Sequence, residues 1–271
     1  MSIKTYDKEI LMVLRINNLL GDLTGFPVFA GGGPRFLGFA TADDINVKEG
    51  DLSSFPWGVW GLDGNDTIAG SSDGNERLLG NNGNDVIAGG SGNDIIYGGK
   101  DNDMLDGNEG NDVVRGDAGN DVIFGDPGND ILRGGQGDDD LNGNDGNDFL
   151  AGDRGIDVLT GGPGADIFLV RSNDEGLGVN QADVITDFSF DEGDRIALPD
   201  GLTELNLLFT DDNLISYEND GFLNDMVIRN RSDGRILGVF LNNSNFDLIG
   251  SFESASPFAL AINGSQFQFL A

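Results

Sequence analysis

Aspartate residues recur at every ninth position through the middle of this chain. Ten follow one another at that interval without a break, and one earlier copy of the pattern adds another. They are Asp66, Asp85, Asp94, Asp103, Asp112, Asp121, Asp130, Asp139, Asp148, Asp157 and Asp166. Carboxylate oxygens are the ligands that hard divalent cations prefer. A regular file of carboxylates therefore indicates cation binding.

The composition excludes several other kinds of site. The 271 residues include no His and no Cys, which removes zinc and haem ligation, thiolate and Ser–His nucleophiles, and disulfides. The 47 acidic residues against 15 basic ones give a net charge of −32, so nucleic acid and anionic lipid are unfavourable partners. No run reaches the roughly 18 apolar residues of a membrane-spanning helix, so we expect no transmembrane segment. Cations are the partners that this charge attracts.

The aspartates belong to a nine-residue repeat. Glycine begins each of ten regular copies, Asp stands at the sixth position, and an apolar residue stands at the eighth. Two looser copies, Gly61–Ala69 and Gly70–Leu79, come first, so that twelve copies span residues 61–169. The eighth position is apolar in all twelve. A disordered acidic tract has no reason to keep that position apolar, so the repeat indicates a folded structure.

Each copy predicts one loop and one short strand. Glycine at the first and usually the fourth position permits positive φ, so six residues can form a tight loop. The last three residues make a minimal strand whose eighth residue points to one face, while the seventh and ninth point to the other. One copy cannot bury its apolar side chain alone, but stacked copies can. If each copy turns the chain through half a coil, copies two apart stack at about 4.8 Å.

This stacking sorts the sixth-position acids into two files, one that contains Asp66 and Asp85 and another that contains Glu76 and Asp94. Neighbouring charges about 4.8 Å apart repel by about 3.5 kcal/mol at an effective dielectric constant of 20. Summed along both files, this repulsion exceeds the usual stability of a folded domain. The coil is therefore predicted to close only when cations lie between the loops. Ca²⁺ suits oxygen ligands better than Zn²⁺ or Mg²⁺.

One complete copy, Gly89–Tyr97, reads Gly-Gly-Ser-Gly-Asn-Asp-Ile-Ile-Tyr. It matches G-G-x-G-x-D-x-U-x, and the chain resembles the RTX (repeats-in-toxin) family in which this pattern recurs. The resemblance implies an all-β fold, a right-handed parallel β-roll solenoid that holds Ca²⁺ through the sixth-position aspartates and loop carbonyls. The glycine candidates are Gly80, Gly83, Gly89, Gly92, Gly98, Gly107, Gly110, Gly116, Gly119, Gly125, Gly128, Gly134, Gly137, Gly143, Gly146, Gly152 and Gly155.

The number of ions follows from the stacking. Two stacks of six loops leave five gaps each, so we expect about eight to ten Ca²⁺ when the edge is discounted. Four residues depart from the pattern: Asp101 replaces the fourth Gly, Ile156 the fifth Asn, Asp140 the apolar seventh residue and Glu76 the sixth Asp. Glu76 also stands beside an inserted residue, so the sites at the N-terminal edge should be the least regular.

The first and last repeats, which span residues 61–169, divide the chain into three segments. Residues 1–60 are expected to be an N-terminal capping segment, 61–169 the nonapeptide β-roll, and 170–271 a C-terminal antiparallel β cap with a secretion signal or an ordinary final strand at its end. The aromatic residues just before the first repeat fit a plug for the open end better than a sugar-binding platform.

The C-terminal segment carries its own signals. Met226–Ile228 and Ile236–Leu241 flank Asp233-Gly234, which favours a hairpin. Asp187 and Asp194 lie in stretches that resemble the segment that closes RTX rolls. They are extra calcium candidates, with solvated turn acids as an equal alternative.

The seventh position of one predicted sheet carries a ridge of apolar residues. These are Ile95, Val113, Ile131, Phe149 and Ile167, all on an outer face. The ridge is either covered by the termini of the protein or is a docking or self-association surface.

Two motifs that resemble catalytic or metal sites are better explained by the repeat. Gly70–Gly74 matches the G-x-S-x-G elbow of serine hydrolases but lies in a repeat loop, and the chain has no His to act as base. Asp138–Phe149 begins like an EF-hand but has Phe149 in place of the bidentate Glu. We therefore expect a chain that is not an enzyme.

The sequence favours a calcium-binding protein whose β-roll folds on external Ca²⁺ and that has a structural or adhesive role. The resemblance implies a bacterial protein that is secreted or surface-bound, exported by a type I system without a cleaved signal peptide. The alternative is an accessory module that binds a surface polysaccharide, as in RTX enzymes that modify polysaccharides. A pore-forming toxin ranks last because no membrane-active segment is present.

Overall fold

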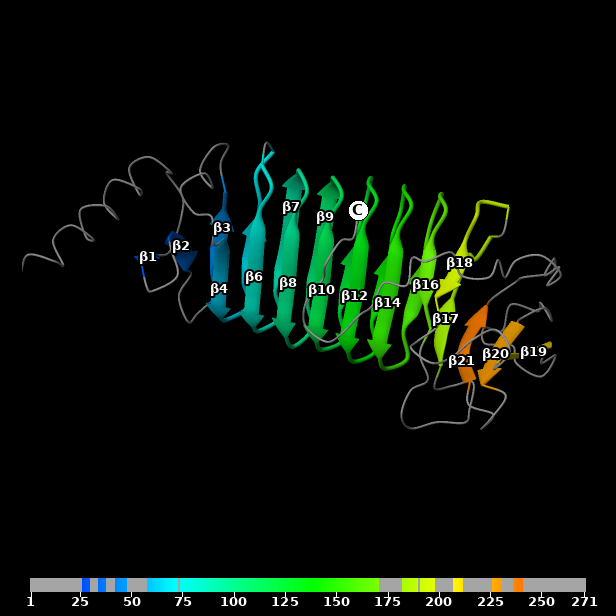
Figure 1. Cartoon of the computed structure of the whole chain (residues 1–271). Helices are drawn as coiled ribbons and strands as arrows, with labels where there is room; N and C mark the ends of the chain where they lie inside the picture. The colour runs from blue at the N-terminus through cyan, green and yellow to red at the C-terminus, as the bar shows by residue number, and fades with distance from the viewer. Residues whose placement is uncertain are drawn as a thin grey trace, which may run out of the picture.

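The computed structural model describes ten stretches of the chain: residues 26–29, 34–37, 42–47, 58–72, 74–170, 182–189, 191–197, 207–211, 226–230 and 236–240. Every regular element in these stretches is a β-strand. Most of the strands form a parallel β-solenoid of about six turns, in which successive strands from β2 to β19 alternate between two sheets (Figure 1). In this described part, no helix is long and apolar enough to cross a membrane.

One sheet has ten strands, in the order β1 (Phe26–Phe29), β2 (Pro34–Leu37), β4 (Val59–Asp63), β6 (Arg77–Asn82), β8 (Ile95–Lys100), β10 (Val113–Ala118), β12 (Ile131–Gln136), β14 (Phe149–Arg154), β16 (Ile167–Leu169) and β18 (Arg195–Ala197). The other has eleven, in the order β19 (Leu207–Asp211), β20 (Met226–Asn230), β21 (Ile236–Phe240), β17 (Asp183–Ile185), β15 (Val158–Thr160), β13 (Asp140–Asn142), β11 (Val122–Phe124), β9 (Met104–Glu109), β7 (Val86–Ser91), β5 (Thr67–Ala69) and β3 (Asp44–Asn46).

The register of the strands confirms that each copy makes half a coil. In the ten-stranded sheet Ile95 pairs with Val113, and Val113 pairs with Ile131, at intervals of eighteen residues. In the other sheet Met104 pairs with Val122 in the same way. All pairs within the repeats are parallel, so equivalent positions of the repeat lie side by side along each sheet.

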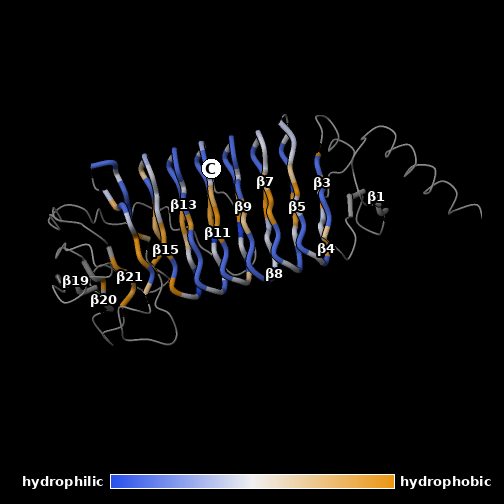
Figure 2. Tube along the Cα trace, turned by 180° about the vertical axis from the view of Figure 1, so that it is seen from behind, coloured by the Kyte–Doolittle hydropathy of each residue, from blue (hydrophilic) through white to orange (hydrophobic). Residues whose placement is uncertain are grey.

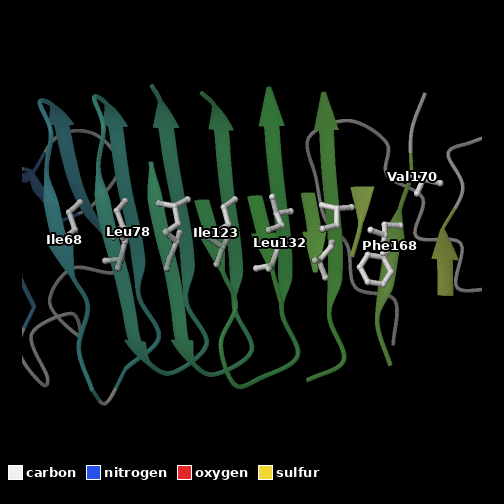
Figure 3. Packing of buried hydrophobic residues seen from close by; sticks show 14 of the residues in the cluster. Ile68, Leu78, Ile123, Leu132, Phe168 and Val170 are labelled. Atoms are coloured by element: carbon white, nitrogen blue, oxygen red, sulfur yellow. The ribbon is translucent and has the colours of Figure 1, made fainter. Parts of the chain in front are cut away.

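The eighth-position residues fill the space between the two sheets. Each of the twelve side chains from Ile68 to Phe168 is no more than 1% exposed. They form one continuous file that runs the length of the roll (Figure 3). Figure 2 shows the consequence for hydropathy: a hydrophobic band crosses the strands, and hydrophilic loops lie on either side. At the C-terminal end the ring of Phe168 packs against that of Phe188, with centroids 6.0 Å apart.

The stacked core is longer than the predicted 61–169. Ile45 and Val59 extend it on the N-terminal side, and Ile185 extends it on the C-terminal side. β3 pairs with β5, β17 pairs with β15, and β18 pairs with β16, all in parallel. Several strands are longer than the three residues predicted, because they continue for six residues into the first three positions of the next copy, whereas β5, β11, β13, β15 and β16 have three residues as predicted. The division into three segments remains a prediction.

The loop glycines differ from the prediction at one position. Left-handed φ occurs at the second and fourth positions, as at Asp117 (φ 75°) and Gly119 (φ 145°), whereas Gly116 at the first position does not have it. Most other second positions hold Gly, Asn or Asp, residue types that tolerate this backbone conformation, whereas Leu62 adopts it (φ 90°) without that tolerance. The first glycine is needed for a different reason, a close approach described below.

The expected hairpin partners β20 and β21 do pair antiparallel, and β19 pairs antiparallel with β20. β21 in turn pairs in parallel with β17 and so continues the eleven-stranded sheet. The capping role of residues 170–271 stays a prediction, and the tail from 241 to 271 lies outside the described residues, as does most of the expected aromatic plug.

Replacing Ile123 by Ala should lower the free energy of unfolding by about 2–5 kcal/mol, because it leaves a cavity in the file of core side chains. The half-buried neighbour Val122 is the matched control, and Val122→Ala should cost less than about 1 kcal/mol. Urea midpoints followed by circular dichroism, with calcium present for all variants, measure the difference. Equal midpoints for the two variants would contradict the assignment of the core face.

Candidate metal sites

The sixth-position acids lie in the two predicted files, and they are buried. All eleven predicted aspartates are at most 3% exposed. Within each file, one carboxylate oxygen of each aspartate accepts a hydrogen bond from the backbone of the preceding turn of the roll. The backbone N–H of Asp103 donates to Oδ1 of Asp121, and that of Asp121 donates to Oδ1 of Asp139, each at 2.8 Å. Across both files these N···Oδ1 distances are 2.6–2.9 Å.

The second carboxylate oxygen has no such bond. In the described part of the chain, Oδ2 of every one of the eleven aspartates is buried without a hydrogen-bond partner. A buried polar atom with no partner is unfavourable, and a buried carboxylate is more so. A bound proton or a bound cation would remove that cost, so these oxygens mark the candidate sites.

The first-position glycine leaves room beside each Oδ2. A Cβ on Gly116 would lie 2.1 Å from Oδ2 of Asp121 and 2.8 Å from the carbonyl oxygen of Gly134, so no side chain fits there. The same pair of oxygens, one carboxylate from the same copy and one carbonyl from the next turn of the roll, surrounds Gly80, Gly89, Gly98, Gly107, Gly125 and Gly143. Two oxygens of different chemical type therefore converge on the backbone of each of these glycines.

The donor set is poor in side chains. Among the residues that the structure describes, no three acidic side chains gather into one potential metal cluster. A cation held here would need backbone carbonyls as well as carboxylates. Ca²⁺ accepts such mixed oxygen ligands in flexible geometry, while Mg²⁺ keeps its waters and demands a strict octahedron. The residues present therefore fit calcium.

The fourth-position glycines stack on one another. A Cβ on Gly110 would lie 1.6 Å from the carbonyl oxygen of Gly92, and a Cβ on Gly128 would lie 1.5 Å from that of Gly110. At Asp101, which replaces the fourth Gly, the backbone still adopts φ 72°. Close approach explains both glycines, and Gly110 also has positive φ (148°), while their carbonyls remain predicted ligands only.

The fifth-position residues form a hydrogen-bonded ladder that the sequence did not reveal. The N–H of Asn102 donates to Oδ1 of Asn84, and the N–H of Asn120 donates to Oδ1 of Asn102. Ile156 ends one such ladder by donating its N–H to Oδ1 of Asp138. Its departure from Asn is tolerated because this bond needs only its backbone.

Glu76 behaves differently from the aspartates. Its longer side chain turns into its own loop, where the N–H and the hydroxyl of Ser71 both donate to it, the hydroxyl at 2.8 Å. Both carboxylate oxygens are thus hydrogen-bonded, so this loop does not share the unpartnered oxygen of the other copies. Ser71, which precedes the central Ser72 of the apparent hydrolase elbow, is 5% exposed and donates to that acid.

Both files continue into residues beyond the repeats. Oδ1 of Asp183 accepts the N–H of Asp157, and Oδ1 of Asp194 accepts the N–H of Asp166. Asp183 was missed, although Asp183-Val184-Ile185 keeps the spacing between the acid and the apolar residue. Of the two predicted extra candidates, Asp194 joins a file. The other, Asp187, instead accepts the N–H groups of Gly161 and Gly162.

A family model of the RTX calcium-binding nonapeptide repeat matches the chain in four copies, at residues 59–73, 71–105, 106–141 and 142–172. These ranges cover the files of buried aspartates. The repeat segment belongs to the RTX calcium-binding repeats. A search of curated proteins found no match to the chain. The RTX match extends slightly past the predicted 61–169 on each side and stops before Asp183.

Burial changes the acidity of the RTX aspartates. Loss of hydration, followed by repulsion from neighbouring carboxylates, raises the pKa of Asp103 and Asp139 to about 8. The same causes raise the pKa of Asp112 and Asp148 to about 7. Backbone N–H donors oppose these shifts without cancelling them. Without a cation, burial in the RTX roll therefore favours the protonated form of these four carboxyl groups.

Acidification should stabilise the metal-free roll. Because the folded pKa values are raised above the ordinary 3.8, the roll binds protons more tightly than the unfolded chain does. The stabilisation is fully present below pH 3.8 and is lost as the pH rises through about 6 to 8. Circular dichroism of calcium-stripped protein, titrated from about pH 8 down to about pH 5, should show a gain of β-structure.

The control is Asp103→Asn with Asp139→Asn, which removes the two repeat aspartates whose pKa is raised to about 8. This variant should lose the upper part of the pH dependence. A β-signal that is independent of pH, or that grows as the pH rises, would contradict the burial of ionisable carboxylates in the folded roll.

Proposed function

We propose that this chain is a non-enzymatic structural protein whose RTX roll folds when it binds about eight to ten Ca²⁺ ions. The observation that carries the proposal is the unpartnered, buried Oδ2 oxygen repeated along both files. The sixth-position aspartates would hold the ions together with glycine carbonyls of the loops, and Ca²⁺ would supply the positive charge that allows the carboxylates to stack.

The proposal includes folding outside the cell. Repeats of this family occur in extracellular bacterial proteins. Extracellular calcium modules bind with Kd of about 10⁻⁴–10⁻³ M, so they would stay empty at cytosolic calcium levels and fill outside. An empty chain of net charge −32 would remain unfolded by its own repulsion and could be exported before it folds. Export by a type I system, to the medium or the cell surface, fits that order of events.

A second function, an accessory module that binds a polysaccharide, has one observation in its favour. On the outer face of the ten-stranded sheet the ring of Tyr97 lies between two guanidinium groups, 5.5 Å from that of Arg77 and 5.7 Å from that of Arg115. A shallow groove of about 300 Å³ adjoins them. An aromatic ring with flanking cations can contact a sugar, but this groove is a single small feature, while the carboxylate files run through the whole roll. The structural function is therefore preferred.

Calcium titration tests the structural function. Circular dichroism should show a disordered chain without ions, a β-rich chain with Ca²⁺, and little response to Mg²⁺. Asp121→Asn should raise the calcium midpoint, because it removes a central carboxylate from one file. The matched control is Asp140→Asn, which removes the same charge from an exposed side chain on the outer face.

The control should leave the midpoint within about twofold of the parent protein, since exposed charges contribute little. An equal effect of the two substitutions would mean that total charge, and not a specific ligand, sets the calcium response. A full response to Mg²⁺ would exclude the proposed selectivity.

A further inference from the structure

The basic residues of the repeats are confined to one sheet. Five Lys or Arg residues lie between residues 61 and 169, and each of five successive strands of the ten-stranded sheet carries one. They are Arg77 on β6, Lys100 on β8, Arg115 on β10, Arg133 on β12 and Arg154 on β14. We call the outer surface of these five strands the basic face. In a chain of net charge −32, this one-sided placement is a distinct feature.

Two of the five charges are already paired within the face. Arg115 forms an ion pair with Asp117, and Arg133 forms one with Asp153, both with N···O distances of 2.5 Å. The side chains of Arg77, Lys100 and Arg154 are exposed. The basic face therefore presents three cationic groups beyond its internal pairs.

The opposite surface has the complementary charge. We call the outer surface of β5, β7, β9, β11, β13 and β15 the acidic face. Those strands carry Asp106, Glu109 and Asp140, and they contain no basic residue. Glu109 and Asp140 are exposed, and Asp106 is half-buried. Three acidic groups on one face thus stand against three basic groups on the other.

Both faces also carry an apolar ridge at the seventh position. The predicted ridge runs along the outer side of the ten-stranded sheet, where its most exposed members are Ile95, on the basic face, and Ile167, on the adjacent strand β16. A second ridge, which the sequence analysis missed, runs along the acidic face through Val86, Met104 and Val158. These five side chains are 36–48% exposed. Because both ridges follow the same repeat, their residues have the same spacing along the roll, about 4.8 Å per strand.

We propose that the basic face of one folded roll docks on the acidic face of a second copy of this chain. Opposite charges and ridges of equal spacing make the two faces complementary. The contact is heterologous, so the docked pair keeps one free basic face and one free acidic face, and further copies can add. The inference rests on the proposed function, because only the calcium-loaded roll would display both faces.

The size of the faces predicts a weak individual contact. The five six-residue strands of the basic face, about 20 Å long at about 4.8 Å spacing, give about 500 Å² per copy. Stable interfaces bury about 800 Å² per partner, so association should depend on protein concentration and should weaken with salt. A symmetric contact between two basic faces would place like charges together, and charge complementarity disfavours it.

Charge reversal on one face at a time tests the docking. The first variant carries Lys100→Glu and Arg154→Glu on the basic face, and the second carries Glu109→Lys and Asp140→Lys on the acidic face. Sedimentation velocity of the full chain in saturating calcium should show association of the parent protein. Each variant alone should associate at least about tenfold more weakly, because its two faces now carry like charges. An equimolar mixture should associate again, since each reversed face then meets an opposite one.

Circular dichroism on the same samples separates the two proposals. A parent protein that folds with calcium but stays monomeric at every concentration would overturn the docking and leave the proposed function standing. An effect of the basic-face variant alone, with none from the acidic-face variant, would also overturn it, because the acidic face would not be the partner. No calcium-induced fold in the parent protein would overturn the proposed function itself.

Discussion

The structure depends on burying one carboxylate oxygen per repeat without a hydrogen-bond donor. Oδ1 of each aspartate accepts a backbone N–H from the preceding turn of the roll, so the side chain cannot turn away from the stack. Oδ2 is then held inside, next to a glycine that leaves no side chain in the way. A hydrophobic file of single side chains cannot offset a row of buried charges by itself. The fold and its dependence on a cation are therefore two aspects of the same constraint.

Several positions of the repeat allow the carboxylate to be buried, each by a different contact or backbone conformation. The first glycine, which has no side chain, lets a carboxylate oxygen and a carbonyl oxygen approach its backbone. The second residue adopts left-handed φ, and the fourth glycine lets successive loops stack closely. The Asn at the fifth position adds a ladder of backbone bonds alongside the acids. Where the sixth residue is Glu76, the hydroxyl and N–H of Ser71 take the place of an external partner. That loop shows how a copy can bury its acid without a cation.

Much of this was predictable because the repeat places equivalent residues side by side. The alternation of strands, the core file from Ile68 to Phe168 and the two files of acids follow from the period alone. The positive φ at the second position was not predictable, because Leu62 and Asn81 adopt it as well as Gly90. Asp183 was missed because the chain between it and the last repeat breaks the period, and strand pairing restores the register. The second apolar ridge was missed because Asp140 interrupts it in the sequence.

Backbone hydrogen exchange at the sixth position tests the central claim most directly. The N–H groups of Asp103 and Asp121 donate to carboxylates inside the files, so their protection reports the stacking of the acids. The measurement belongs above pH 8, where even the carboxylates with pKa raised to about 8 are ionised. The account predicts strong protection with calcium and exchange at the rate of an unfolded chain in chelator. Strong protection of these N–H groups in chelator would show that the charged files can stack without a cation, and would contradict it.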